Sequence, residues 1–165
     1  MPRAGIALGS NLGDRMANLC EAMRLIAEIA DKTSPFLKAA IYQTEPLHCP
    51  PDSPNFLNTV VEISFDGNAE ELLEKTRAIE TQMGRTPNPQ RNAPRLIDLD
   101  ILYFGQERHD STHLTLPHPR MHERRFVLQP LSDIRPDLIL PGHSKTVASL
   151  LDELSSDEAP LVKVV

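Results

Sequence analysis

Two aspartates carry the strongest chemical signal in the chain. Asp98 and Asp100 stand two residues apart in the apolar segment LIDLDILYFG, residues 96–105. Residues i and i+2 of a strand share a face and lie roughly 6.6 Å apart, so both carboxylates should point the same way. Paired carboxylates suit a hard divalent ion such as magnesium, which takes one or two of them with waters and phosphates. The alternative is two solvated acids at the end of a strand.

Arginines flank the acidic segment on both sides, and His118 precedes the second group. The six are Arg85, Arg91, Arg95, Arg120, Arg124 and Arg125. Guanidinium groups bind phosphates through planar, bidentate contacts and stay charged near pH 7. Carboxylates for a metal ion and guanidiniums for phosphates predict a nucleotide phosphate site. The alternative is a solvated face on which the arginines pair with surface acids.

A possible binding surface for a flat ring lies in another predicted strand, residues 56–65. Phe56 and Asn58 share a face of that strand and offer an aromatic ring beside an amide. Taken singly, Phe56 and the later Phe126 are more typical of core residues. Glu80 and Arg77 are placed on the helix face opposite Ile79, where an exposed ion pair is the simpler interpretation.

Other familiar catalytic patterns are missing from the sequence. The segment GSNLGD lacks the lysine of a P-loop, so Gly9 and Gly13 are interpreted as a turn residue and a helix-start residue. No GxSxG segment is present. A P-loop nucleoside triphosphatase and a hydrolase with that nucleophile motif are therefore disfavoured.

The order of predicted elements indicates how these residues are positioned. Strands are expected at 5–8, 36–44, 56–65 and 96–105, the last returning as a hairpin towards Thr115. Helices are expected at about 14–30, 68–83, 120–129 and 147–154. This βαββαβ order predicts an α+β, ferredoxin-like fold: a mostly antiparallel sheet with helices on one face, plus additional helices and a hairpin.

Length and composition bound the remaining possibilities. A chain of 165 residues with 40% hydrophobic residues predicts one domain, residues 1–165, with a core at about 4–155 and a frayed C-terminal tail. A net charge of -6 disfavours nucleic acid as a partner. No apolar run is long enough for a membrane span or a signal peptide, so we expect a cytoplasmic protein without a membrane partner.

Four stretches resemble one enzyme family in both order and spacing. They are IALGSNLGDR, YQTEPL with the later NFLNTVVEI, APRLIDLDILYFG, and LPHPRMHERRFVLQPL. The chain resembles the 6-hydroxymethyl-7,8-dihydropterin pyrophosphokinases of folate biosynthesis, which transfer pyrophosphate from ATP to a pterin alcohol and release AMP. The resemblance covers most of residues 5–131 and implies ATP and a pterin alcohol as small-molecule substrates. We also expect a monomer.

The resemblance also implies a role for individual residues. Asp98 and Asp100 would bind two Mg²⁺ ions, and with Arg85 and Arg95 they would form the catalytic set. The residues expected around ATP are Arg77, Glu80, Arg91, Ile101, Thr115, His118 and Arg124. The residues expected around the pterin are Thr44, Leu47, Phe56, Asn58 and Phe126, with the two phenylalanines sandwiching the ring. Some relatives carry Trp at Asn92, Arg at Pro87 and Gln at Arg77.

Two rival functions remain open on the sequence. One is a nucleotidyl or phosphoryl transferase for a different small alcohol, with the same metal and arginine site but another ring pocket. The other is a ferredoxin-like binding or regulatory module in which the acids are structural.

Overall fold

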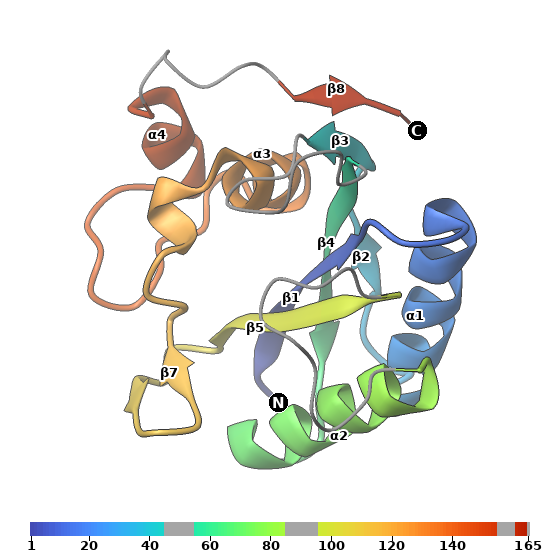
Figure 1. The fold of residues 1–165 in the computed structure, drawn as a ribbon. Coiled ribbons are helices and arrows are strands. Elements are labelled where there is room, and N and C mark those ends of the chain that lie inside the picture. Colours follow the sequence, from blue (N-terminus) through green and yellow to red (C-terminus); the bar gives the residue numbers. More distant parts are fainter. Residues whose placement is uncertain (45–54, 85–95, 155–160, 165) are drawn as a thin grey trace.

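The computed structural model describes residues 1–44, 55–84, 96–154 and 161–164, and its elements follow the predicted order (Figure 1). The strands are β1 (Arg3–Ser10), β2 (Leu37–Lys38), β3 (Tyr42–Thr44), β4 (Phe56–Ser64), β5 (Asp98–Phe104), β6 (His109–Asp110), β7 (Thr115–Leu116) and β8 (Val162–Lys163). The α-helices are α1 (Arg15–Ile29), α2 (Ala69–Gln82), α3 (Arg125–Ile134) and α4 (Val147–Asp152), with a 3₁₀ turn at Met121–Glu123.

The main sheet has the strand order β5-β1-β4-β3-β8, and β2 also pairs with β4. Every pairing among these described strands is antiparallel. With α1 and α2 as the two connecting helices, the arrangement confirms the predicted α+β, ferredoxin-like fold. Two details differ from the sequence prediction. Segment 36–44 is divided into β2 and β3, and β6 pairs with β7 in a separate small sheet instead of returning along β5.

Both connecting helices begin at residues that the sequence marks as caps. The Asp14 side chain accepts a hydrogen bond from the backbone N–H of Ala17 at 3.1 Å. Asn68 and Glu71 form a reciprocal capping box at the start of α2. Each cap pairs backbone donors that a helix leaves without an internal acceptor, so the helix starts are set locally.

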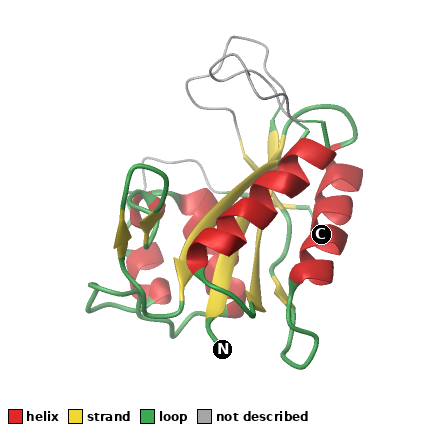
Figure 2. Cartoon of the chain, turned by 90° about the horizontal axis from the view of Figure 1, so that it is seen from below, coloured by secondary structure: helices red, strands yellow, loops and turns green. Residues whose placement is uncertain are grey.

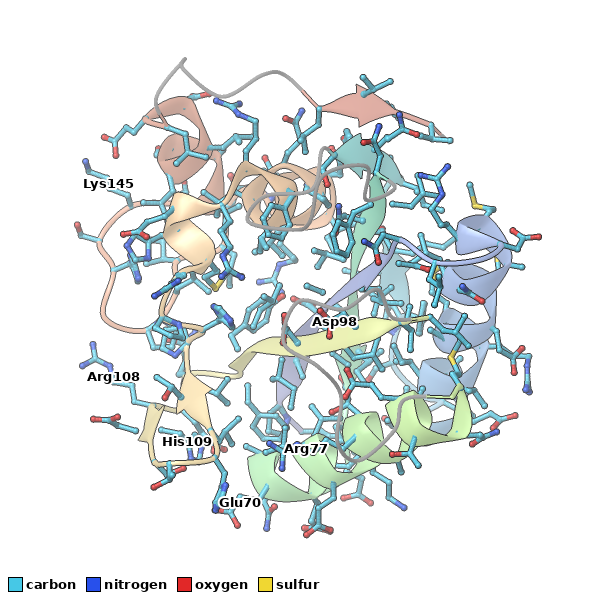
Figure 3. All side chains as sticks on the ribbon, in the orientation of Figure 1. Glu70, Arg77, Asp98, Arg108, His109 and Lys145 are labelled. Atoms are coloured by element: carbon cyan, nitrogen blue, oxygen red, sulfur yellow. The ribbon has the colours of Figure 1, made fainter. Side chains whose placement is uncertain are left out.

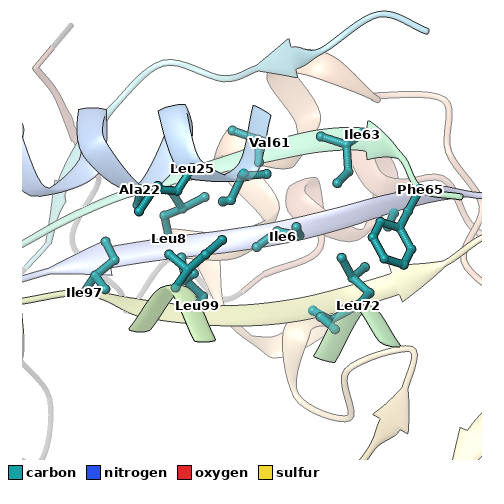
Figure 4. Close-up of a cluster of buried hydrophobic side chains, with 14 of the residues drawn as sticks. Ile6, Leu8, Ala22, Leu25, Val61, Ile63, Phe65, Leu72, Ile97 and Leu99 are labelled. Atoms are coloured by element: carbon teal, nitrogen blue, oxygen red, sulfur yellow. The ribbon is translucent and has the colours of Figure 1, made fainter. Parts of the chain in front are cut away.

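The first face of the sheet carries the larger hydrophobic core. Figure 4 shows side chains of β1, β4 and β5 packed against α1 and α2. Ile6 and Leu8 of β1 and Ile63 of β4 are at most 1% exposed. Leu99 and Ile101 of β5 belong to the same cluster, so both of these side chains point towards α1 and α2.

The opposite face is also covered, which corrects the prediction of helices on one face only. Val60 of β4 and Leu102 of β5 form a second core with Leu128 and Leu131 of α3 and Val147 of α4. Figures 1 and 2 show helices on both sides of the sheet. The sheet is therefore the middle layer of three.

Helix α3 continues through Pro130, whereas the sequence prediction ended the helix before it. A proline inside a helix costs about 3 kcal/mol because it lacks the N–H and crowds the preceding turn. Val127, Leu128 and Leu131 are at most 3% exposed, so burial of this stripe offsets the loss. The residues before Arg125 form the 3₁₀ turn and not the first turn of the helix.

A buried carboxylate ties α3 to the far end of the sheet. Glu62 of β4 is 1% exposed; its Oε1 accepts from Arg3 Nε at 2.8 Å and its Oε2 from Arg135 Nη1 at 2.6 Å. The Tyr103 hydroxyl also donates to Oε2. Tyr103 reaches Glu62 across Gly5, where any Cβ would overlap the tyrosine ring. Arg135 ends α3, so this network fixes that end of the helix.

The described part of the C-terminal tail is paired, unlike the frayed tail that the sequence predicts. Val162 and Lys163 form β8 against Gln43 and Tyr42 of β3. No helix in the described ranges is both long enough and apolar enough to cross a membrane.

Candidate active site

Asp98 and Asp100 share the α3 face of the sheet, as their spacing predicts. Leu99 and Ile101 point into the core on the α1 and α2 side, so the two alternating aspartates point the other way. Asp98 is half-buried and Asp100 is exposed. Figure 3 shows Asp98 beside β5 near the middle of the molecule. The carboxylates are thus held by a central part of the fold and remain accessible to solvent.

The donor set around the two aspartates fits magnesium better than zinc. Among the described residues, no group of three or more His, Cys, Asp or Glu side chains could hold a metal ion. Zinc centres normally take three or four such ligands from the protein. Magnesium takes one or two carboxylates and obtains the remaining oxygens from water and substrate phosphates, which matches an acid pair on an open strand end.

Gly9 connects the acid pair with the predicted ring-binding residues. In β1 it lies opposite Asp98 of β5 on one side and opposite Asn58 of β4 on the other. We call these three residues the Gly9 row. Neighbouring strands lie about 4.8 Å apart, so the outer two Cα atoms are separated by roughly 10 Å. Gly9 is therefore a strand residue, and its interpretation as a turn residue is wrong.

The missing side chain of Gly9 leaves space on the α3 face. A Cβ at this position would lie 2.9 Å from Asn58 Oδ1 and 3.6 Å from Phe56 Cδ1. The first of these distances is closer than a carbon and an oxygen normally approach. Glycine thus allows the Asn58 amide to lie over β1, on the side of the acid pair.

Asn58 and Thr44, both predicted at the edge of the pterin, contact each other. Asn58 Nδ2 donates to Thr44 Oγ1 at 2.7 Å, and Asn58 is 7% exposed. With Nδ2 committed to Thr44, Oδ1 faces Gly9. Phe56 precedes Asn58 by two residues on the same strand face and is half-buried. One amide oxygen and one partly exposed aromatic ring are therefore held side by side.

The segment between β7 and α3 brings the second group of predicted residues to the same face. The His118 backbone N–H donates to the Leu102 carbonyl at 2.8 Å and ties this segment to β5. Arg124 precedes α3, with its guanidinium carbon 5.6 Å from the centroid of the Phe126 ring. Phe126 is half-buried, so part of its side chain remains accessible.

His118 is held as a neutral imidazole. Burial, followed by the nearby guanidiniums of Arg124 and Arg120, lowers the pKa of His118 to about 4. Its Nδ1 accepts a hydrogen bond from the Arg120 backbone N–H at 3.2 Å. The ring proton then lies on Nε2, so His118 presents a neutral hydrogen-bond donor near pH 7.

Glu80 is buried, contrary to its placement on the exposed face of its helix. It is 5% exposed, and its Oε2 accepts from the Leu99 backbone N–H at 2.9 Å. Arg77 is exposed on the same helix (Figure 3). An ion pair exposed on the surface therefore does not describe Glu80. A direct contact of either residue with ATP stays a prediction.

Two further residues predicted near ATP lie around β5. The Ile101 side chain is 6% exposed in the first core, so only its backbone can face a ligand. Alternate residues direct their N–H groups to the same edge of a strand, so Ile101 shares the outward orientation of Leu99. Thr115 is exposed on β7, and β7 contacts β5.

Leu47, Arg85, Arg91 and Arg95 lie outside the described residues, so their predicted roles stay predictions. Ser10 is a residue near the site that the sequence did not single out. It is fully buried, and its hydroxyl donates to the Leu96 carbonyl at 2.6 Å, two residues before Asp98. The one sequence feature that could have indicated a role for Ser10 is its position directly after Gly9.

The fold and the Gly9 row together define an α+β, ferredoxin-like protein with a candidate site for a polyphosphate and a flat ring. Residues 5–136 match the family model described as 7,8-dihydro-6-hydroxymethylpterin-pyrophosphokinase (HPPK). The chain belongs to this family.

Several relatives carry names from the same pathway. The 2-amino-4-hydroxy-6-hydroxymethyldihydropteridine pyrophosphokinase of Bacillus subtilis is 47% identical over 131 residues, or 79% of this chain and 77% of that protein. The Haemophilus influenzae protein of the same name is 36% identical over 155 residues, or 94% of both chains. A folate synthesis bifunctional protein of Arabidopsis thaliana is 43% identical over 129 residues, or 78% of this chain and 26% of that protein.

Solved structures agree on the fold. The wild-type Plasmodium falciparum HPPK-DHPS chain with pteroate has a TM-score of 0.72 at 14% identity, covering 92% of this chain and 44% of that one. A triple mutant of the same protein with pteroate gives 0.70 at 14% identity, covering 92% and 43%. At this identity the likeness concerns the fold alone. This chain spans under half of those longer chains.

Proposed function

We infer that this protein transfers pyrophosphate from ATP to 6-hydroxymethyl-7,8-dihydropterin, giving the pterin diphosphate and AMP in folate biosynthesis. Family membership supports the reaction, with ATP as co-substrate. The observation that carries the proposal to particular residues is the Gly9 row. It holds a carboxylate and an amide on one face of the sheet, on either side of a strand residue without a side chain.

The proposed site divides into two halves along this row. The pterin edge would bind Asn58 and Thr44, and its ring would lie between Phe56 and Phe126. The phosphates would lie towards Asp98 and Asp100, with Arg124 and the neutral His118 as donors from the segment before α3. The hydroxymethyl group would then extend over Gly9 towards the phosphates.

In the transfer step the pterin hydroxyl oxygen attacks the β-phosphorus of ATP in line. A new O–P bond forms, the bond from the β-phosphorus to the oxygen bridging it to the α-phosphate breaks, and AMP leaves with that oxygen. The hydroxyl proton leaves to solvent or to a carboxylate, since no general base stands out. Positioning of the two substrates and neutralisation of charge supply most of the rate in reactions of this kind.

We propose Mg²⁺ as the metal, with two ions bound at the acid pair. The two carboxylates fit this ion, because the remaining ligands come from water and phosphate oxygens. When bound, magnesium would neutralise charge on the transferring group. Asp98 and Asp100 would hold the ions, and Arg85 and Arg95 are the further cations that the resemblance implies for this step.

The test is product analysis with purified protein, ATP, Mg²⁺ and the pterin alcohol. The proposal predicts AMP and pterin diphosphate in equal amounts, and no turnover with alcohols that lack the pterin ring. Formation of ADP, or equal rates with unrelated alcohols, would favour the rival phosphoryl transferase. ATP-independent ligand binding without turnover would favour the rival binding module. Action as a cytoplasmic monomer without a nucleic-acid partner stays a prediction.

A further inference from the structure

Two buried side chains fix the backbone of β5 on either side of Asp98. On the β1 side, the Ser10 hydroxyl donates to the Leu96 carbonyl at 2.6 Å. On the α2 side, the Glu80 carboxylate accepts from the Leu99 N–H at 2.9 Å. Ser10 is fully buried and Glu80 is 5% exposed. The two contacts therefore hold the backbone just before and just after Asp98.

The contact from Glu80 matters because β5 lies at the edge of the main sheet. Among the strands that the structure describes, β5 is the end strand of the main sheet and pairs with β1 alone. Backbone groups on its outer edge therefore face no other described strand, and an unpaired buried N–H is costly. Glu80 occupies this edge at Leu99, the residue between Asp98 and Asp100, and takes the place of a neighbouring strand there.

The hydrogen bonds around Ser10 fix the direction of its hydroxyl proton. Asn18 Nδ2 donates to Ser10 Oγ at 3.2 Å and also donates to the Leu12 carbonyl at 2.8 Å. Ser10 Oγ thus accepts from Asn18 and directs its own hydrogen to the Leu96 carbonyl. The start of β5 is in this way connected to the first turn of α1, which holds Asn18.

We propose that Glu80 and Ser10 are positioning residues for the acid pair: they fix the β5 backbone so that Asp98 and Asp100 hold the geometry that binds the divalent cation. This inference rests on the proposed function and assigns Glu80 a role through the protein backbone. It explains why a carboxylate is buried on the apolar stripe of α2. A charged acceptor makes a stronger hydrogen bond to an N–H than a neutral one.

The first readout is independent of catalysis. Amide hydrogen exchange at Leu99, followed by NMR in the free protein, should quicken at least tenfold in Glu80→Ala and partly recover in Glu80→Gln, whose amide oxygen can still accept. Glu74→Gln, an exposed change on the same helix, is the matched control and should leave exchange unchanged. Unchanged exchange in Glu80→Ala would overturn the proposal.

The second readout connects the backbone to the metal. The Mg²⁺ concentration for half-maximal turnover should rise about tenfold in Glu80→Ala, while KM for the pterin stays near that of the parent. If KM for ATP alone rises and neither the Mg²⁺ dependence nor Leu99 exchange changes, Glu80 is a nucleotide contact and the proposal is wrong. If Glu80→Ala does not fold, Glu80→Gln carries the exchange measurement at Leu99 and Ser10→Ala carries the Mg²⁺ dependence. Absence of the pterin reaction in the parent protein would contradict the proposed function while leaving the exchange result interpretable.

Discussion

Asp98 and Asn58 lie opposite the same residue, Gly9, from the two strands that flank β1. The sheet therefore places an acid and an amide on one face at roughly two strand spacings, or about 10 Å. That span suits a substrate whose ring is bound at one end and whose reactive group extends to the other.

Replacement of Gly9 by alanine should impair pterin binding selectively. The added Cβ would lie 2.9 Å from Asn58 Oδ1, so the amide must move from its present position. Because losing a well-placed hydrogen bond costs about 1–1.5 kcal/mol, KM for the pterin should rise about fivefold to tenfold. Steady-state kinetics measure this. The internal control is the affinity for ATP, which should stay within about twofold, and an equal loss for both substrates would contradict the account.

Asp98→Asn and Asp100→Asn should each lower turnover by about 100-fold to 1000-fold, the usual effect of losing one preorganised charge contact. Neither side chain belongs to a hydrophobic core, and Asp100 is exposed, so both variants should still fold. AMP release and thermal unfolding provide the two measurements. Asp110→Asn, an exposed change in β6, serves as the control. Normal turnover of Asp100→Asn at ordinary Mg²⁺ would refute the metal assignment.

His118 should remain neutral throughout the neutral pH range. Its pKa is lowered from 6.5 to about 4 by burial and then by Arg124 and Arg120. The unfolded chain binds a proton below pH 6.5 while the folded protein does not. The contribution of His118 to stability is therefore complete above pH 6.5 and is lost as pH falls towards 4. NMR titration of the imidazole measures the pKa directly, and unfolding of the parent and of His118→Gln across this pH range measures its effect on stability. An imidazole that titrates near pH 6.5 would contradict the lowered pKa.

Glu62→Gln should destabilise the fold without impairing the site. Burial alone would raise the pKa of Glu62, but hydrogen bonds from Tyr103, Arg135 and Arg3 outweigh burial and hold the pKa below its ordinary value. The stabilisation is present above the unfolded pKa and is lost as pH falls through the lower folded pKa. We expect a loss of about 1–3 kcal/mol at neutral pH, measured by denaturant unfolding.

The acid dependence provides a second check on Glu62. The difference in stability between the parent and Glu62→Gln should shrink as the solution is acidified. At neutral pH and 25 °C, kcat should be unchanged, because Glu62 lies opposite Gly5 and not in the Gly9 row. A stability difference that does not depend on pH would contradict the ionised state of Glu62.

Local patterns predicted much of the fold. Alternation placed Asp98 and Asp100 on one face, and the cap residues Asp14 and Asn68 marked the helix starts because their hydrogen bonds are local. The second helix layer was missed because covering of the α3 face depends on how distant segments pack. The end of α3 was also misplaced: the local rule ends a helix before a proline, but α3 continues through Pro130 because its apolar stripe is buried.

The sequence predicted which residues form the site better than it predicted which of them lie next to one another. Asp98, Asn58 and Phe56 could be chosen from spacing and chemistry, but the register that joins the first two through Gly9 depends on pairing between distant strands. Glu80 was misplaced because its charge suggested solvent. Its spacing of four residues from the buried Thr76 was a usable signal that the charge obscured.

The most direct test of the account is a crystal structure of the protein with Mg²⁺, a nonhydrolysable ATP analogue and the pterin alcohol. We predict the pterin edge at Asn58, the phosphates and metal at Asp98 and Asp100, and the hydroxymethyl oxygen above Gly9, in line with the β-phosphorus. A structure in which the two aspartates turn away from the phosphates, or in which the ring binds away from Asn58, would contradict it.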